Sequence, residues 1–404
     1  MKIDSIHTPH ILLPKKGVDM TAFAVIACDQ FTSELDYWDS LKKEIGNKPS
    51  TFNMMFPEAY LGKVDETKYI AQINENIDAY LKNGVLEDIG ECFILVERKT
   101  PYTPRRLGII ISIDLEDYSY QKGVRSLIRA SEATIVERIP PRLKIRENAT
   151  VELPHILFLF DDKDKEIVES LYKNKDRYRC VYDFELNKGG GHLKGYEITD
   201  VERVKKQFYS LLEKNNSKLL FIVGDGNHSL ATAKAHWDKI KISLSESERK
   251  IHPARFALVE AINLYDEGLA FEPIHRIVFN AKEDFLPELK KRLDGNFVSH
   301  VYSRGGKDVL KMPSNAPQAY KIIQGYIDEY LKAHRDVSVD YIHDVSHLIE
   351  VSKKNPGSIA IEMPALTKGD VFTYIANDEV LPKKSFSMGN AKEKRYYLES
   401  KRIK

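Results

Sequence analysis

A short apolar run that stops at two glycines constrains this chain more than any other feature. Residues 218–223 are mostly β-branched, aromatic or aliphatic, as in a buried strand, and residues 229–237 have helical composition and spacing. The sequence Gly-Asp-Gly-Asn-His-Ser at 224–229 therefore predicts a tight turn from a strand into a helix. Glycines permit a positive φ and a close backbone approach, and the first amides of a helix attract anions. We expect this turn to hold an anion.

Each polar residue of the turn also has an ordinary structural explanation. Asn227 or Ser229 could cap the helix, His228 could lie on the surface, and Asp225 could accept hydrogen bonds from its own backbone. A carboxylate, an amide, an imidazole and a hydroxyl gathered around two glycines nevertheless favour a functional site. The glycine spacing is neither that of a Walker loop nor that of a dinucleotide-binding loop, so a conventional nucleotide fold is not indicated.

Strand-like and helical segments alternate along the rest of the chain. Strands are expected at residues 23–28, 92–96, 107–113, 155–160 and 256–262, and helices at residues 33–45, 66–81, 201–213 and 284–293. This pattern predicts a mixed α/β (α+β) fold in which a mixed sheet has flanking helices. The anion-binding turn at 224–229, called the phosphate turn below, is expected to follow one strand of that sheet, and a second α/β lobe is expected beside it.

The length of 404 residues suggests more than one region. We expect an N-terminal α/β region at 1–125, a catalytic region with the phosphate turn at 126–280, and a C-terminal α/β region at 281–404.

Composition excludes several classes of protein. The 61 basic and 60 acidic side chains give a net charge of only +1, which argues against general nucleic-acid binding. No apolar run is long enough to span a bilayer, and residues 1–18 lack the apolar centre of a signal peptide, so a cytoplasmic protein is expected. The three cysteines are far apart with no CxxC spacing, which indicates reduced, mostly structural thiols.

A basic segment at 126–156 is the second informative stretch. Arginine forks suit phosphate oxygens, so a phosphate-binding role is at least as well supported as a salt-bridged surface. A Pro-Pro pair at 140–141 prevents one continuous helix here. The charged residues of the segment are Arg129, Arg138, Arg142, Lys144 and Arg146, together with Glu132, Glu137 and Glu147.

Three consecutive glycines at 189–191 mark a third stretch, residues 187–196, which also carries His192 and Lys194. Two interpretations stay open: a flexible connector, or a mobile loop that closes over a polar substrate. The C-terminal lysines at 383, 384, 392 and 394 are interpreted mainly as solvated charges, with a minor role as phosphate-donor contacts.

Short motifs spread over nearly the full chain resemble a known family. They are WDSL at 38–41, SIDLEDY at 112–118, IRASEAT at 128–134, RIPPR at 138–142, LPHI at 153–156, GGGHLKGY at 189–196, ARFALVE at 254–260, EPIHR at 272–276 and SFSMG at 385–389. With the turn at 224–229 they resemble the bacterial branch of the family catalogued as domain of unknown function 1015. That family name implies no chemistry.

The turn itself resembles that of a more distant superfamily. Residues 225–229 are similar to the Asp-Gly-His-His-Arg turn of the ParB and sulfiredoxin superfamily, which includes free serine kinases. In those kinases the turn helps to hold the phosphate donor, and a glutamate on an earlier segment takes the proton of the serine hydroxyl. The resemblance implies that Glu132 is this base, that Asp225 is the turn aspartate and a metal ligand, and that His228 contacts the donor.

The chain departs from that pattern at two positions. Asn227 stands where the first histidine is usual, and Ser229 stands where the arginine is usual. The missing guanidinium would then come from elsewhere in the chain. The resulting phosphate-binding set is Gly224, Gly226, Asn227, Ser229, Arg129, Arg138 and Arg142.

The resemblance and the residues together predict a small-molecule phosphotransferase. Its most specific form is a free L-serine kinase that makes O-phosphoserine from ATP, ADP or pyrophosphate with Mg²⁺. A metal-dependent phosphohydrolase and a non-enzymatic phosphate- or nucleotide-binding regulator stay open as alternatives. Neither a nucleic-acid nor a membrane partner is expected, and the sequence does not indicate an oligomeric state.

Overall fold

The C-terminal residues return to the part of the molecule in which the chain began. The computed structural model describes residues 4–121, 124–132, 134, 139–215, 218–304, 306–377 and 380–404. Its first compact unit comprises Met1–Ala130, Thr134–Leu269 and Asn390–Lys404, and its second comprises Ser131–Ala133 and Ala270–Gly389. This division differs from the three consecutive regions predicted at 1–125, 126–280 and 281–404, because the chain re-enters the first unit at Asn390.

A large mixed sheet forms the centre of the first unit, in the order β11-β12-β5-β6-β14-β10-β13-β8-β7, with β1 paired to β6. Pairing is antiparallel except between β10 and β14, β8 and β13, and β7 and β8. The strands are β1 (Ile6–His7), β5 (Phe93–Lys99), β6 (Arg106–Asp114), β7 (Tyr118–Ser119), β8 (Ile128–Ala130), β10 (Leu157–Phe160), β11 (Cys180–Leu186), β12 (Gly191–Ile198), β13 (Phe221–Asp225) and β14 (Phe256–Asn263). Every residue of β6 and β14 is buried, which explains their apolar sequences. The predicted α/β class with a mixed sheet is confirmed.

Three two-stranded pairs complete the first unit. β2 (His10–Pro14) pairs with β4 (Leu86–Glu91), β3 (Val25–Ile26) with β22 (Tyr396–Tyr397), and β9 (Val151–Glu152) with β23 (Lys401–Arg402). Two of these pairs join the C-terminal residues to strands from much earlier in the chain.

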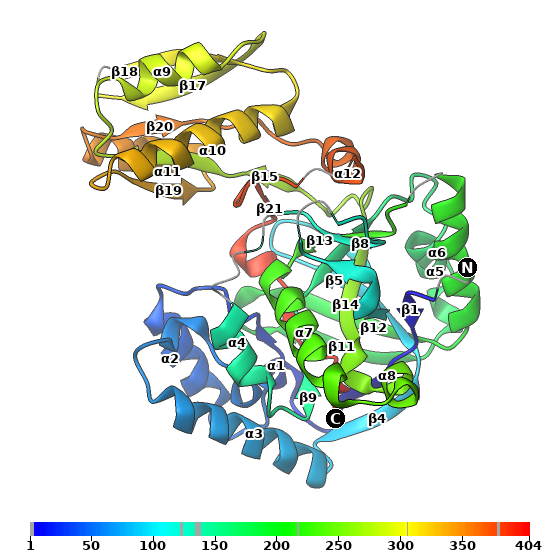
Figure 1. The fold of residues 1–404 in the computed structure, drawn as a ribbon. Helices are drawn as coiled ribbons and strands as arrows, with labels where there is room; N and C mark the ends of the chain where they lie inside the picture. Colours follow the sequence, from blue (N-terminus) through cyan, green and yellow to red (C-terminus); the bar gives the residue numbers. More distant parts are fainter. Residues whose placement is uncertain are drawn as a thin grey trace. The chain divides into compact units, whose positions relative to one another are not determined.

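The helices of the first unit are α1 (Met20–Phe23), α2 (Leu35–Ile45), α3 (Glu66–Lys82), α4 (Ile139–Arg146), α5 (Val168–Lys173), α6 (Val201–Lys214), α7 (Asn227–Ile240) and α8 (Glu246–Ile251). Most of these helices bury apolar side chains, as α6 does with Val204, Phe208 and Leu211, whereas α8 buries none. Helix α4 begins at Ile139, so its two prolines occupy the first turn, where a missing N–H costs no helical hydrogen bond. Helices α4 and α7 lie side by side (Figure 1).

The second unit has its own antiparallel sheet in the order β18-β17-β20-β16-β19 (Figure 1). The side chains of Ile277, Ile342, Leu348 and Ala360 form one apolar cluster between the sheet and α11. The elements are β15 (Phe271–Pro273), β16 (His275–Phe279), α9 (Phe285–Arg292), β17 (Phe297–Ser303), β18 (Gly306–Met312), α10 (Ala316–Ala333), β19 (Ser338–Ile342), α11 (Val345–Lys354), β20 (Ile359–Ile361), α12 (Lys368–Ala376) and β21 (Phe386–Met388), with β15 paired to β21. In neither unit do the described residues form a helix long and apolar enough to cross a membrane.

The glycine-rich stretch at 187–196 is neither a connector nor a covering loop. A short 3-10 turn, Asn187–Gly189, leads directly into β12, which pairs with β11 on one side and β5 on the other. His192 and Lys194 lie on this strand, and both side chains contact Asp183 of β11, at 2.9 and 2.7 Å. The predicted loop conformation at these two residues is wrong, because each lies in a paired strand with an acidic partner beside it, and their contact with a substrate stays a prediction.

Candidate functional site

The predicted strand-to-helix turn is present. Strand β13 ends at Asp225, Gly226 has a φ of 80°, and α7 begins at Asn227. A Cβ at Gly226 would lie 3.0 Å from the Cα of Ile156, so this position requires glycine for its backbone angle and for its close packing. The first amides of α7 have no acceptors within the helix, and the positive end of the helix dipole adds to their attraction for an anion.

A lysine of the C-terminal segment, interpreted from the sequence mainly as a solvated charge, lies at this turn. The ammonium group of Lys394 is 3.0 Å from Oδ2 of Asp225, while Oδ1 of Asp225 accepts the amide hydrogen of Gly226 at 2.9 Å. Lys394 is only 8% exposed. The turn therefore combines helix amides, a carboxylate and a nearly buried lysine.

Two buried arginines fix the backbone around Lys394. Arg98 donates to the carbonyl oxygen atoms of Lys392 and Lys394 at 3.1 and 3.3 Å, and Arg106 donates to that of Glu393 at 3.0 Å. These bonds cross from the central strands β5 and β6 to the C-terminal segment. No local spacing could reveal this contact, because it depends on the return of the chain to the first unit.

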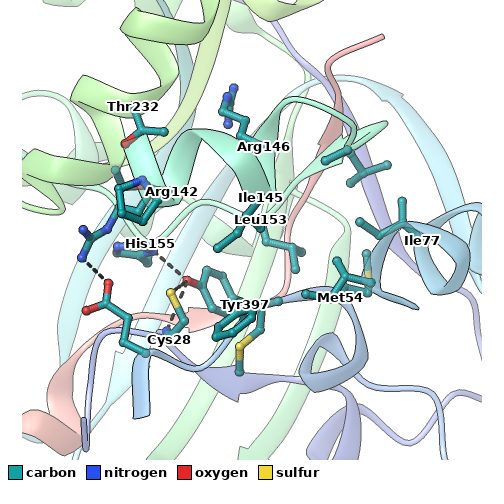
Figure 2. A pocket seen from close by; sticks show the side chains of 18 of the residues that line it. Cys28, Met54, Ile77, Arg142, Ile145, Arg146, Leu153, His155, Thr232 and Tyr397 are labelled. Atoms are coloured by element: carbon teal, nitrogen blue, oxygen red, sulfur yellow. Dashed lines mark hydrogen bonds and ion pairs between the residues drawn. The ribbon is translucent and has the colours of Figure 1, made fainter. Parts of the chain in front are cut away.

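A cavity of about 410 Å³ lies beside the first two turns of α7 (Figure 2). Ser229 and Thr232 of α7 form part of its wall, and α3 and α4 contribute other parts. The remaining lining residues are mostly apolar: Met54, Met55, Phe56, Leu61, Ile73, Ile77, Pro141, Ile145, Ala149, Val151, Leu153 and Ile403.

One wall of the cavity carries a chain of hydrogen-bonding groups. The Tyr397 hydroxyl lies 2.8 Å from Nδ1 of His155 and 3.2 Å from Sγ of Cys28, and Nε2 of His155 lies 3.7 Å from Asp29 (Figure 2). Burial raises the pKa of the Cys28 thiol and of the Tyr397 phenol, so both stay protonated at neutral pH. Burial opposes the charge of Asp29, but His155, Gln30 and other neighbours hold the pKa of this carboxyl below its usual value.

The predicted phosphate-binding arginines do not share one environment. Arg129 lies on β8 and donates from Nε to the carbonyl oxygen of Ser126 at 3.0 Å. Arg142 lies on the cavity wall and forms an ion pair with Glu58. Arg138 falls outside the described residues. The assignment of these arginines to phosphate stays a prediction.

Glu132, the predicted base, belongs to the second unit. Its two carboxylate oxygens accept the backbone amides of Lys384 and Ser385 at 3.0 and 3.1 Å. Burial raises the pKa of Glu132, although these amides and the charge of Arg276 favour its ionised form.

The other predicted residues of the turn lie where the sequence places them. Gly224 lies within β13, and Asn227, His228 and Ser229 form the first turn of α7. The carbonyl oxygen of His228 accepts the Thr232 hydroxyl at 2.7 Å. Their roles in phosphate binding and catalysis stay predictions.

The fit of a divalent metal depends on Asp225. In the described parts of the chain, no group of three or more histidine, cysteine, aspartate or glutamate side chains is arranged to hold a metal ion. Mg²⁺ commonly binds through one or two carboxylates and the phosphates of a substrate, and Asp225 fits that pattern. It would hold the metal only together with phosphate oxygens, and such a metal would neutralise charge on them.

Comparison with protein families gives one full-length match. The model of the family described as "Protein of unknown function (DUF1015)" matches residues 12–402. No curated protein matches the chain.

Solved structures with distant similarity include three kinds of protein. A conserved hypothetical protein from Pyrococcus furiosus is 11% identical with a TM-score of 0.38, and the match covers 73% of this chain and 95% of that one. A free serine kinase in complex with AMP is 9% identical with a TM-score of 0.42, covering 73% and 92%. SbnI with a C-terminal truncation, from Staphylococcus aureus, is 8% identical with a TM-score of 0.38, covering 69% and 82%.

Proposed function

This chain belongs to the DUF1015 family, and from the chemistry of its turn we propose that it is a small-molecule phosphotransferase. One observation carries the proposal: the ammonium group of Lys394 lies 3.0 Å from Asp225 at the point where α7 begins. Helix amides and a fixed cation attract phosphate oxygens, and an adjacent carboxylate can hold a phosphate-bound Mg²⁺. Phosphoryl transfer needs mainly this kind of positioning and charge stabilisation.

The proposed reaction transfers a phosphoryl group to an alcohol. Glu132 takes the hydroxyl proton as the new oxygen–phosphorus bond forms, and the leaving phosphate or nucleotide keeps the electrons of the broken bond. The raised pKa of Glu132 suits a general base, because it brings the proton affinity of the carboxylate nearer to neutral pH. Lys394 and the α7 amides stabilise the charge on the phosphate oxygens, and His228 contacts the donor.

Glu132 is proposed as the base because it lies in the basic segment ahead of the turn, as the catalytic glutamate of the free serine kinases lies on a segment ahead of theirs.

Free L-serine is the proposed acceptor, from the resemblance of the turn to that of free serine kinases. The proposed donors are ATP, ADP and pyrophosphate, recognised chiefly through their phosphates. The protein would be incubated with Mg²⁺, L-serine and each donor in turn, and O-phosphoserine would be sought by mass spectrometry. Product from any donor supports the kinase; pyrophosphate binding by calorimetry without product from any alcohol leaves only a phosphate-binding protein.

Replacement of the proposed base tests the mechanism. Glu132→Gln should lower kcat by about a hundredfold or more and leave pyrophosphate affinity nearly unchanged, because Gln cannot accept the proton. Glu272→Gln, at an exposed position of the second unit, is the matched control and should keep full activity. Full turnover in Glu132→Gln would remove this residue from the role of base.

A further inference from the structure

We propose that the cavity beside α7 binds an uncharged, mainly apolar molecule of about eight carbon atoms that carries one hydroxyl or carbonyl oxygen. The inference does not depend on phosphotransfer. It follows from three properties of the cavity: its apolar lining, the pairing of the charged groups on its wall, and a serine hydroxyl that has no hydrogen-bond partner in the described part of the chain.

The size of the cavity and its apolar lining indicate a ligand with a hydrocarbon body. Met54, Ile73 and Ile77 are each less than 5% exposed, yet they line an open space of about 410 Å³. A dry apolar cavity of roughly 150 Å³ can hold one benzene molecule, so this larger space accommodates a body of about eight carbon atoms. Ligand pockets of this order of volume are lined mainly by apolar side chains with a few placed polar groups. Each methylene group buried here would add to the affinity.

The charged groups on the wall are paired with one another, so they leave no charge for a ligand to neutralise. Arg142 forms an ion pair with Glu58, and both side chains line the cavity. Arg146, which also lines the cavity, pairs with Glu152 at 2.6 Å. An ionised ligand would lose its hydration here without gaining a counter-charge. The wall therefore selects against anions and cations alike.

The remaining polar groups at one end of the cavity also bond to one another. Asp29 lies 3.7 Å from Nε2 of His155, and Nδ1 of His155 lies 2.8 Å from the Tyr397 hydroxyl (Figure 2). That hydroxyl donates to Sγ of Cys28 at 3.2 Å and accepts the backbone amide of Cys28 at 3.3 Å. These bonds make this part of the wall a surface against which the apolar body of the ligand can pack.

Ser229 supplies the hydrogen bond for the single oxygen of the ligand. It lies in the first turn of α7 and lines the cavity. The neighbouring hydroxyl on the wall, that of Thr232, donates to the carbonyl oxygen of His228 at 2.7 Å, whereas the Ser229 hydroxyl has no partner among the described residues. A serine hydroxyl can donate and accept, so it suits either a hydroxyl or a carbonyl oxygen. The backbone amide of Ser229, rather than its side chain, would then serve the phosphate turn.

Calorimetry with the full chain compares neutral and charged probes of similar size. 1-Octanol should bind at least tenfold more tightly than either octanoate or octylammonium, because only the alcohol avoids burying a charge that the paired wall cannot compensate. Affinity should rise about fourfold for each added methylene group from 1-butanol to 1-octanol. An acid or an amine that binds as tightly as the alcohol, or an affinity that does not depend on chain length, would overturn the proposal.

Variants that fill the cavity locate the site. Ile145→Trp adds volume to the lining at a half-buried position of α4 and should lower 1-octanol affinity at least tenfold. Ile77→Phe fills the cavity from α3 with the same expected result, and circular dichroism establishes that each variant is folded. The control is Ile242→Trp, which makes the first substitution at a position that is 78% exposed and lies outside the lining. Unchanged binding of 1-octanol in the folded variants would place the ligand outside this cavity, contrary to the proposal.

Ser229→Ala tests the hydrogen bond to the ligand. It should lower the affinity for 1-hexanol about three- to tenfold and leave that for 1-hexanethiol nearly unchanged, because a thiol forms only weak hydrogen bonds. Thr232→Val is the matched control: it removes the wall hydroxyl that already has a partner, so it should affect the two probes equally. An equal effect of Ser229→Ala on the two probes would overturn the role of Ser229.

Discussion

Lys394 provides the positive charge that the turn lacks in its own sequence. Ser229 occupies the position where the resemblance implies an arginine, and the ammonium group of Lys394 instead reaches Asp225 from the C-terminal segment. Loss of this charge would leave Asp225 without its neutralising partner beside the incoming phosphate. Under the proposed function, Lys394 would therefore act on the donor phosphate both directly and through its effect on Asp225.

Substitution of Lys394 should separate charge from packing. Lys394→Met should weaken pyrophosphate binding by about tenfold or more, because a buried charge pair contributes at least that much to the affinity. Lys394→Arg should retain most of the affinity, because it keeps the positive charge. Calorimetry gives the two affinities, and Lys392→Met, at an exposed position two residues earlier, is the matched control. Wild-type affinity in Lys394→Met would show that phosphate does not bind at this turn.

His236 predicts a pH dependence of stability. It lies on α7, is 2% exposed, and its Nδ1 atom has no hydrogen-bond partner among the described residues. Burial lowers the pKa of His236 from 6.5 to about 4, with Arg146 and Lys404 adding to the effect. The imidazole of His236 is therefore protonated at a higher pH in the unfolded chain than in the folded protein. The contribution of neutral His236 is complete above pH 6.5 and is lost as the pH falls toward 4.

Thermal unfolding of a variant without this imidazole measures the effect. His236→Leu should show a smaller fall in Tm between pH 7.5 and pH 4.5 than the wild type does, because only in the wild type does the unfolded chain gain a proton on this imidazole that the folded protein does not take up. His7 and His275 also titrate with lowered pKa values, but they are present in both proteins and cancel in the comparison. Parallel Tm curves would mean that His236 is accessible to protons in the folded state.

At the scale of the element, the local sequence pattern predicted the strand-to-helix turn, but it did not predict the glycine-rich strand β12. Residues 218–223 and 229–237 predicted a strand and a helix, and the structure has Phe221–Asp225 and Asn227–Ile240. At 187–196 the glycines suggested mobility, but Gly190, Gly191 and Gly195 serve close packing. A Cβ at Gly195 would lie 2.1 Å from the Tyr182 ring. The neighbouring strands that impose this packing cannot be read from the stretch itself.

Contacts between distant segments account for what the sequence could not predict of the site. The approach of Lys394 to Asp225, and the grouping of Cys28, His155 and Tyr397, join residues more than a hundred positions apart. The residue types at the turn were informative because they are adjacent in sequence. No comparable sequence pattern predicts the cavity, since its apolar lining residues cannot be told from ordinary core residues in the sequence.

The turn tolerates only glycine at position 226, which gives an element-scale prediction. Gly226→Ala should lower Tm and weaken pyrophosphate binding, because alanine disfavours a φ of 80° and its Cβ would press on Ile156 at 3.0 Å. Gly62→Ala is the matched control: Gly62 has a φ of 70°, and no heavy atom lies within 4 Å of its added Cβ. It should show only the conformational cost of about 1 kcal/mol. Equal losses of Tm in the two variants would show that the contact with Ile156 has no effect.

For the molecule as a whole, the first unit is completed by the last segment of the chain. Strands β22 and β23 pair with β3 and β9, and Arg395 lies buried between the carboxylates of Glu260 and Glu399 at 2.5 and 2.6 Å. Removal of one partner from such a group leaves an uncompensated buried charge, which costs about 3–5 kcal/mol. The first unit therefore cannot reach its full stability until the C-terminal residues have been synthesised, after the whole of the second unit.

Deletion of residues 390–404 should consequently destabilise the first unit selectively. Calorimetric unfolding of the truncated chain should lose or strongly lower the transition of the first unit, while the transition of the second unit, residues 270–389, persists. Limited proteolysis with mass spectrometry identifies which transition belongs to which unit, because fragments from 270–389 should survive longest.

Arg395→Met tests the same point without deletion. It should lower the Tm of the first unit, whereas Arg402→Met, at an exposed position of β23, should leave that Tm unchanged. A truncated chain that kept both transitions would show that the C-terminal segment is an accessory to the first unit and not part of its core.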